Sequence, residues 1–141
     1  IDTVSSAEGA IGYADASRAG ELGTVAIGVG DSFVPYSAEA AAKVVDASPQ
    51  AEGATGKQLT IELDRATTAD GAYPLVLVSY SIACSRYDSE QDTQNVREFL
   101  SYVASEEGQQ RAAEPAVAGS APISGELRSA VEAAIASISA G

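Results

Sequence analysis

An apolar run from Tyr73 to Cys84 constrains this chain more than any other feature. It is about half as long as a membrane-spanning helix and contains Ser79 and Ser81, so we expect a soluble chain. Pro74 lies at the start of the run, and the residues after it, Leu75-Val76-Leu77-Val78, are typical of a strongly buried strand. We therefore predict one strongly buried strand that reaches to about Cys84.

Large apolar side chains are scarce elsewhere. Leu, Ile, Val and Phe supply 29 of the 141 residues, and Ala supplies another 28. This share lies just above the roughly 20% below which disorder is expected. The chain can fold, but leaving any large apolar face exposed would remove much of the stabilisation that burial provides.

Strands and helices alternate before Pro74. Ala10 to Tyr13 reads as a buried strand, and Ser17 to Leu22 reads as a helical turn. A hairpin is predicted from Thr24–Val29 and Phe33–Tyr36 around Gly30-Asp31. The remaining predictions here are a helix capped by Ser37 that ends before Pro49, a loop over 48–57, and an alternating strand from Gln58 to Leu63.

The last third is predicted to be helical. One helix is expected from Thr93 to Ser105 with Asp92 or Thr93 as its cap, and a second from Glu106 with Ser105 as its cap. A loop over 115–122 and a final helix capped by Ser124 follow. Helical spacing predicts that two apolar stripes share one core: Val96, Phe99, Leu100 and Val103, and Leu127, Val131, Ile135 and Ile138.

This order predicts an α/β fold of mixed sheets flanked by helices. The composition changes at Tyr73-Pro74, from hairpin-rich to helix-rich. We therefore expect the chain to cross there between two parts, residues 1–73 and residues 74–141. No internal repeat is present.

Charge and residue usage exclude several classes of function. The net charge is −12 and the eight basic residues are scattered, which argues against nucleic-acid binding. The chain has no histidine, so Ser-His-Asp triads, Cys-His dyads and His-ligated metals are excluded. A single cysteine, Cys84, can form neither an internal disulfide nor a cysteine-only zinc site. We expect no enzyme activity, no cofactor and no metal.

The weaker candidate motifs are explained by ordinary structural roles. Glu62 and Asp64 share one side of a predicted strand, but a solvated face is favoured over an acid–base pair. The Asp88, Glu90 and Asp92 spacing lacks the glycine and distal Glu of a calcium loop. Gly28-Val29-Gly30 lies within a hairpin, which excludes a dinucleotide loop. Cys84 is expected to be structural, and the six tyrosines are expected to be half-buried packing residues.

Four strings together resemble the phosphate-binding proteins of ABC transporters, which are type II extracytoplasmic solute-binding proteins. They are Gly9-Ala10-Ile11-Gly12-Tyr13-Ala14, Ala72-Tyr73-Pro74-Leu75, the stretch from Phe99 to Val103 with Ser105-Glu106-Glu107-Gly108-Gln109, and Ala121-Pro122-Ile123-Ser124. The resemblance covers the whole chain. Asp2-Thr3-Val4-Ser5-Ser6 and the Ser37–Pro49 helix resemble the actinobacterial branch.

The resemblance implies that this chain is the C-terminal half of such a protein. Members are roughly twice as long and clamp phosphate between two lobes joined by crossing strands. Residues 1–73 would complete the second lobe and residues 74–141 the first. The implied partners are inorganic phosphate, an ABC transporter permease and the N-terminal half of the same protein, and the implied location is extracytoplasmic, secreted or anchored through a missing N-terminal segment.

The family's phosphate ligands lie in the other half. They are a hydroxyl residue in an N-terminal loop, a serine at a helix start, a buried aspartate, and an arginine followed by Ser-Gly-Thr; none has a match here. No ligand residue is therefore carried over, and Tyr73 lies near the implied cleft by position only. The alternatives are a same-fold binding protein for another anion or small solute, and a cell-surface structural protein derived from it. A hydrolase is disfavoured, because no Gly-x-Ser-x-Gly motif is present.

Overall fold

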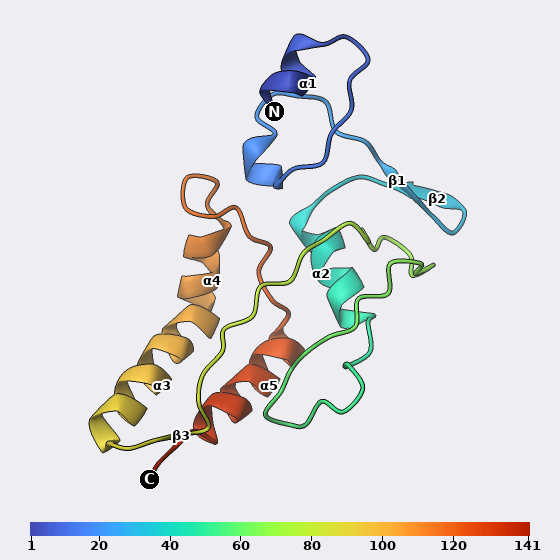
Figure 1. Ribbon diagram of the computed structural model, residues 1–141. Coiled ribbons are helices and arrows are strands. Elements are labelled where there is room, and N and C mark those ends of the chain that lie inside the picture. Colours follow the sequence, from blue (N-terminus) through green and yellow to red (C-terminus); the bar gives the residue numbers. More distant parts are fainter.

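Helices supply most of the regular structure in the computed structural model, which describes residues 1–141 (Figure 1). The strands form two small two-stranded sheets, so the fold is mixed α/β, as predicted. The helical elements are α1 (Asp2–Ser6), the short 3₁₀ helix η1 (Ala16–Arg18), α2 (Ala38–Asp46), α3 (Glu90–Ala104), α4 (Glu106–Ala113) and α5 (Gly125–Ala136). The strands are β1 (Ile27–Val29), β2 (Ser32–Val34), β3 (Arg86–Tyr87) and β4 (Ser139–Ala140).

The predicted hairpin is present. Strands β1 and β2 pair antiparallel, with Gly28 opposite Phe33, and Gly30 turns the chain with a φ of 55°. This left-handed conformation costs glycine little, because it has no Cβ. The buried Val29 and Val34 pack with Ala40 of α2 into a small core.

Helix α2 begins where the sequence predicts. The Ser37 hydroxyl accepts a hydrogen bond from the Ala40 N–H (3.0 Å), and Glu39 lies in the first turn, where its charge favours the helix dipole. Val44 is completely buried. The Tyr73 N–H donates to the Ala40 carbonyl (2.9 Å), so α2 lies between the hairpin and the start of the apolar run.

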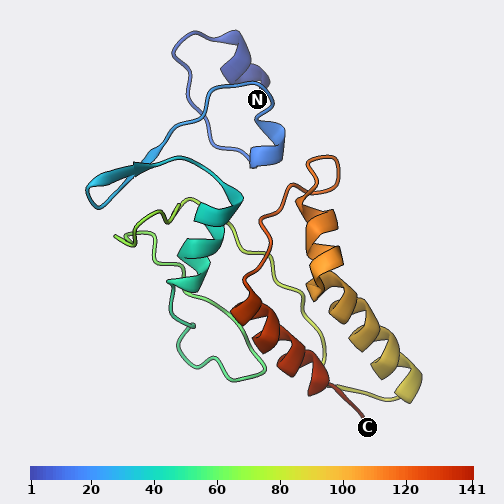
Figure 2. The ribbon, with the colours of Figure 1, turned by 180° about the vertical axis from the view of Figure 1, so that it is seen from behind.

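The C-terminal helices form a group of their own at the opposite end from α1 (Figures 1 and 2). Ser105 caps α4 and Ser124 caps α5, as predicted. Helix α3 begins at Glu90, three residues before the predicted start, because Ser89 accepts the Asp92 N–H and serves as its cap. The assignment of Asp92 or Thr93 as cap was therefore wrong.

Helices α3 and α5 pack against each other, which confirms the predicted pairing in part. An Arg97 guanidinium N–H donates to the Ala136 carbonyl at the end of α5 (2.9 Å), and Ile135 and Ile138 are buried. Phe99 does not join this core, because 65% of it is exposed. Its predicted burial was wrong: the phenyl ring lines an open groove between α3 and residues 81–83.

Two predicted buried strands are also not formed. Residues 10–13 are extended but unpaired, and Ile11 is 78% exposed. Residues 75–84 belong to no sheet either. The predicted strand at 58–63 is reduced to one bridge between Gln50 and Ile61, although its side chains keep the alternation of half-buried and exposed positions. Residues 10–13 and 75–84 have a strand's sequence but lie beside no strand with which they could pair.

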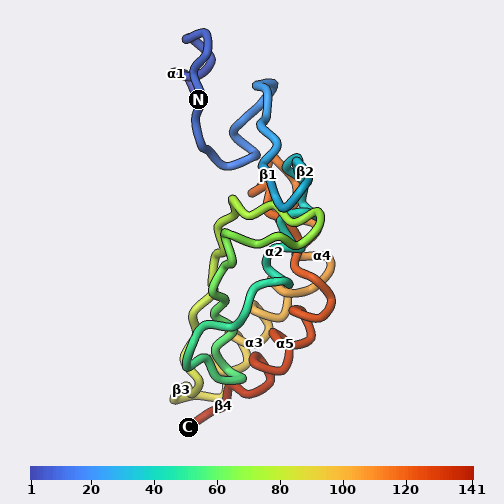
Figure 3. Tube along the Cα trace, turned by 90° about the vertical axis from the view of Figure 1, so that its right-hand side faces the viewer, coloured from blue at the N-terminus to red at the C-terminus, as the bar shows by residue number.

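Residues 73–84 therefore run as a single segment, outside any sheet, between the two helical groups. The segment leaves the side of α2, passes α4 and α5, and ends at β3, beside the C-terminus (Figure 1). There β3 pairs in parallel with β4. The side view shows an elongated molecule with the N-terminal residues at one end (Figure 3).

Candidate functional site

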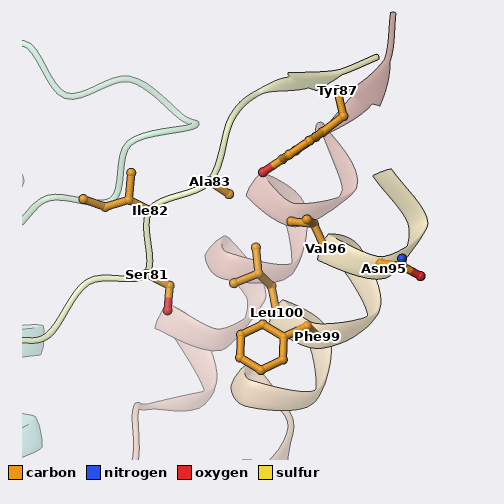
Figure 4. Close-up of a pocket in the computed structure, with 8 residues that line it drawn as sticks. All are labelled: Ser81, Ile82, Ala83, Tyr87, Asn95, Val96, Phe99 and Leu100. Carbon is orange, nitrogen blue, oxygen red and sulfur yellow. The ribbon is translucent and has the colours of Figure 1, made fainter. Parts of the chain in front are cut away.

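Residues 75–84, here called the crossing strand after the strand that their sequence predicts, form an open groove with α3 (Figure 4). Ile82 and Ala83 lie on one side of the groove, and Val96, Phe99 and Leu100 lie on the other. Its volume is about 450 Å³, and six of its eight lining residues are hydrophobic. A groove of this composition suits apolar side chains better than a small anion.

The crossing strand is apolar and largely uncovered. Leu77 is 80% exposed and Ile82 is 96% exposed. None of the backbone N–H or C=O groups of residues 77–83 makes a hydrogen bond within the chain. Burial was the sequence prediction for these residues, and the physical reason for its failure is the absence of a neighbouring strand on either side.

Side chains hold the two ends of this strand. The guanidinium of Arg65 donates to the carbonyls of Pro74 (3.0 Å) and Val76 (3.1 Å), and the Tyr13 hydroxyl donates to the Leu75 carbonyl (3.4 Å). At the far end the Cys84 N–H donates to the Tyr87 hydroxyl (3.1 Å). The roles of Arg65 and Tyr13 could not be predicted from the sequence, because bonds from side chains to distant backbone carbonyls leave no local pattern.

Tyr73 marks the start of the crossing strand. Its half-buried ring meets Tyr36 edge to face, with ring centroids 6.0 Å apart. This packing explains the position of Tyr73 without a ligand. Tyr87 is also half-buried, whereas Tyr13, Tyr36, Tyr80 and Tyr102 are exposed, so the expectation of half-buried tyrosines holds for only two of the six.

The carboxylates that the sequence brings together serve local structure. Asp64 accepts the Ala66 N–H (3.0 Å) within a turn, and Glu62 is exposed. Asp92 accepts the Ser89 hydroxyl (2.7 Å) at the first turn of α3. No three Cys, Asp or Glu side chains lie close enough together to hold a metal ion.

One carboxylate has a perturbed pKa. The side chain and the backbone N–H of Ser17 both donate to Asp15, which lowers the pKa of this carboxyl, and the Arg18 charge lowers it further. Asp15 is the N-cap of η1 and is exposed. Hydrogen bonding to the charged form explains the shift, and no catalytic partner is involved.

The remaining nucleophile and cations are dispersed. Cys84 is exposed on the crossing strand rather than packed in a core. Arg111 pairs with Glu114 on the surface of α4 (2.6 Å), and Arg65 and Arg97 bind backbone carbonyls. Each of these three arginines therefore has a partner within the chain.

The structure is a mixed α/β fold with an open apolar groove beside α3. The family model described as "PBP superfamily domain" matches residues 1–107. The chain therefore belongs to the periplasmic-binding-protein superfamily, whose members are in general solute-binding proteins. Comparison with curated proteins and with solved structures found no match.

Membership has consequences for activity and location. Solute-binding families of this kind are generally non-enzymatic, serve ABC transporters and are typically extracytoplasmic. None of the helices has both the length and the apolar character that a membrane crossing requires.

Proposed function

We propose that this chain is the C-terminal half of an extracytoplasmic phosphate-binding protein, which captures inorganic phosphate for an ABC importer. Superfamily membership supports the solute-binding part of this proposal. The four strings that resemble the phosphate-binding proteins support the ligand. Delivery to a permease, and secretion or anchoring through an N-terminal segment, follow from the same resemblance.

The amount of exposed surface is the observation that carries the half-protein part of the proposal. A folded monomer of 14.2 kDa exposes roughly 6,800 Å² by the usual scaling with mass. This chain exposes 9574 Å², and only 12 of its 141 residues are buried. The excess of roughly 2,800 Å² is what a large obligate partner would cover.

The proposal assigns the phosphate ligands to the other half. A phosphate that loses its water needs a ring of donors around it. Helix N-terminal amides and hydroxyl groups can supply such a ring without a large basic patch, so a net charge of −12 is no obstacle. In this half, the arginines with assigned partners bind backbone carbonyls or a surface glutamate.

Isothermal titration tests the proposal. Phosphate is titrated into the 141-residue chain and into the complete polypeptide that carries it, with sulfate as the matched anion. We expect micromolar or tighter binding of phosphate by the complete polypeptide only. Micromolar binding by the isolated chain would refute the assignment of the ligands to the other half, and selective binding of another solute by the complete polypeptide would refute phosphate.

A further inference from the structure

The loop between α4 and α5, residues 114–124, connects the C-terminal helices to the first part of the chain. Residues 1–73 and residues 85–141 share one hydrogen bond, in which the Ser124 hydroxyl donates to the Asp46 carboxylate (2.8 Å). These two residues are 78 positions apart in the sequence. Asp46 is the last residue of α2 and Ser124 is the cap of α5, so the end of one helix lies at the start of the other (Figure 1).

The same loop approaches the first part of the chain at a second point. Gly119 has a φ of 64°, and a Cβ placed on it would lie 2.7 Å from the Cβ of Ser17 in η1. This distance is shorter than real Cβ atoms adopt, and the backbone conformation also favours glycine. Gly119 and Ser17 are both half-buried. The loop therefore contacts residues 1–73 in two places that are five positions apart, at Gly119 and at Ser124.

Hydrogen bonds fasten this loop to the C-terminal helices. The Ser120 N–H donates to the Ala112 carbonyl at the end of α4 (3.1 Å), and the Ile123 N–H donates to the side-chain oxygen of Gln109 (3.0 Å). The side-chain nitrogen of Gln109 in turn donates to the Val103 carbonyl in α3 (2.8 Å). The loop is thus held to α3 and α4, and its two outer contacts position this whole helical group against residues 1–73.

Ser124 uses different atoms for its two roles. Its hydroxyl oxygen accepts the Leu127 N–H (3.2 Å), which caps α5, and its hydroxyl hydrogen is donated to Asp46. Because a hydroxyl has one donor and two acceptor lone pairs, the bond to Asp46 can break while the cap remains. Asp46 is exposed, so water can take the place of Ser124 at the carboxylate. The contact is therefore reversible without unwinding α5.

We propose that residues 114–124 set the orientation of residues 1–73 relative to residues 85–141. In this device Asp46–Ser124 is the releasable contact, and Gly119–Ser17 is the contact that fixes how closely the loop approaches η1. Asp46 and Gly119 are accordingly positioning residues. The inference concerns contacts within this chain, and it depends neither on the identity of a ligand nor on the proposed function.

Electron–electron spin resonance distances between two nitroxide labels test the inference. The labels are attached through Glu39→Cys on α2 and Glu132→Cys on α5, both exposed, in the complete polypeptide that carries this chain, with Cys84→Ser, no other cysteine and no phosphate. We expect one narrow distance distribution. Asp46→Ala should broaden it at least about twofold, because the two parts then sample more orientations.

Two further substitutions separate the hydrogen bond from the charge. Asp46→Asn keeps an oxygen that accepts the Ser124 hydroxyl, so it should retain the narrow distribution. Asp70→Ala removes the same charge from an exposed side chain that makes no hydrogen bond in this chain, and it should also leave the distribution unchanged. Circular dichroism should show unchanged helix content for Asp46→Ala, because the cap of α5 is intact.

Gly119→Ala tests the second contact. The added methyl group would meet Ser17, so the loop has to move and the distance maximum should shift outside the original distribution. Gly53→Ala is the matched control, because Gly53 also has a positive φ (79°) but nothing within 4 Å of the added Cβ. The control should leave the distance maximum unchanged.

Four results would overturn the inference. An unchanged distribution in Asp46→Ala would show that this hydrogen bond does not set the orientation. Equal broadening in Asp46→Asn or in Asp70→Ala would assign the effect to charge. A fall in helix content in Asp46→Ala would assign it to local unfolding. Equal shifts in Gly119→Ala and Gly53→Ala, or a shift in neither, would remove the role of the Ser17 contact. Because no phosphate is present, each result is separate from the phosphate titration.

Discussion

Truncation of Ile82 to alanine tests whether the crossing strand is covered in the complete polypeptide and exposed in the isolated chain. In this chain 96% of Ile82 is exposed, so the side chain buries almost no apolar area. At about 25 cal/mol per Å² of buried area, its removal should change the free energy of unfolding of the isolated chain by less than about 0.3 kcal/mol. In the complete polypeptide the same change should cost about 2–5 kcal/mol, the usual cost for a buried Ile→Ala.

Val44→Ala is the matched control. Val44 is completely buried within this chain, and the substitution removes two methyl-sized groups. At about 0.8 kcal/mol per group plus a cavity contribution, we expect a loss of about 2 kcal/mol in both polypeptides. A cost that appears in both for Val44 and in only one for Ile82 would locate the missing cover at the crossing strand.

Urea unfolding followed by circular dichroism measures both changes. The reasoning would be refuted by a loss above about 1 kcal/mol for Ile82→Ala in the isolated chain, since the side chain would then be packed in solution. It would equally be refuted by a loss below about 0.5 kcal/mol in the complete polypeptide, since nothing would then cover the side chain.

Two further predictions concern the side chains that hold local structure. Arg65→Ala should free the Pro74 and Val76 carbonyls and speed limited proteolysis of the crossing strand several-fold, whereas Arg111→Ala, which breaks a surface ion pair, should not. Ser17→Ala should raise the pKa of Asp15 toward its ordinary value, as measured by NMR titration. Because this pKa is lowered in the folded chain, the contribution of Asp15 to stability is present above its unfolded pKa and is lost as the pH falls through the folded pKa.

Three helix caps and the hairpin of this chain could be predicted from the sequence. Ser37, Ser105 and Ser124 were identified as helix caps, and each accepts a backbone N–H three residues later. The hairpin around Gly30 was predicted from two alternating runs and one turn. These features depend on atoms within a few residues of one another, so short patterns determine them. The cap of α3 was misassigned, because Ser89, Asp92 and Thr93 are all plausible caps within one turn.

The apolar run that forms the candidate site could be predicted from the sequence, but its position and contacts in the fold could not. The apolar run after Pro74 was recognised, but its groove with α3 and its contacts to Tyr13, Arg65 and Tyr87 were not. Those contacts join residues that folding alone brings together. The absence of ligand residues in this half is a prediction from the resemblance.

By itself the sequence determined which segments could be strands, because alternation and β-branched residues are local properties. Only the tertiary structure decided which of them are paired. Residues 27–34 pair because both strands of the hairpin are adjacent in the chain, whereas residues 10–13 and 75–84 stay single because no partner strand lies beside them. A strand is buried by neighbouring strands. The residues of the crossing strand do not specify which segment would lie beside it.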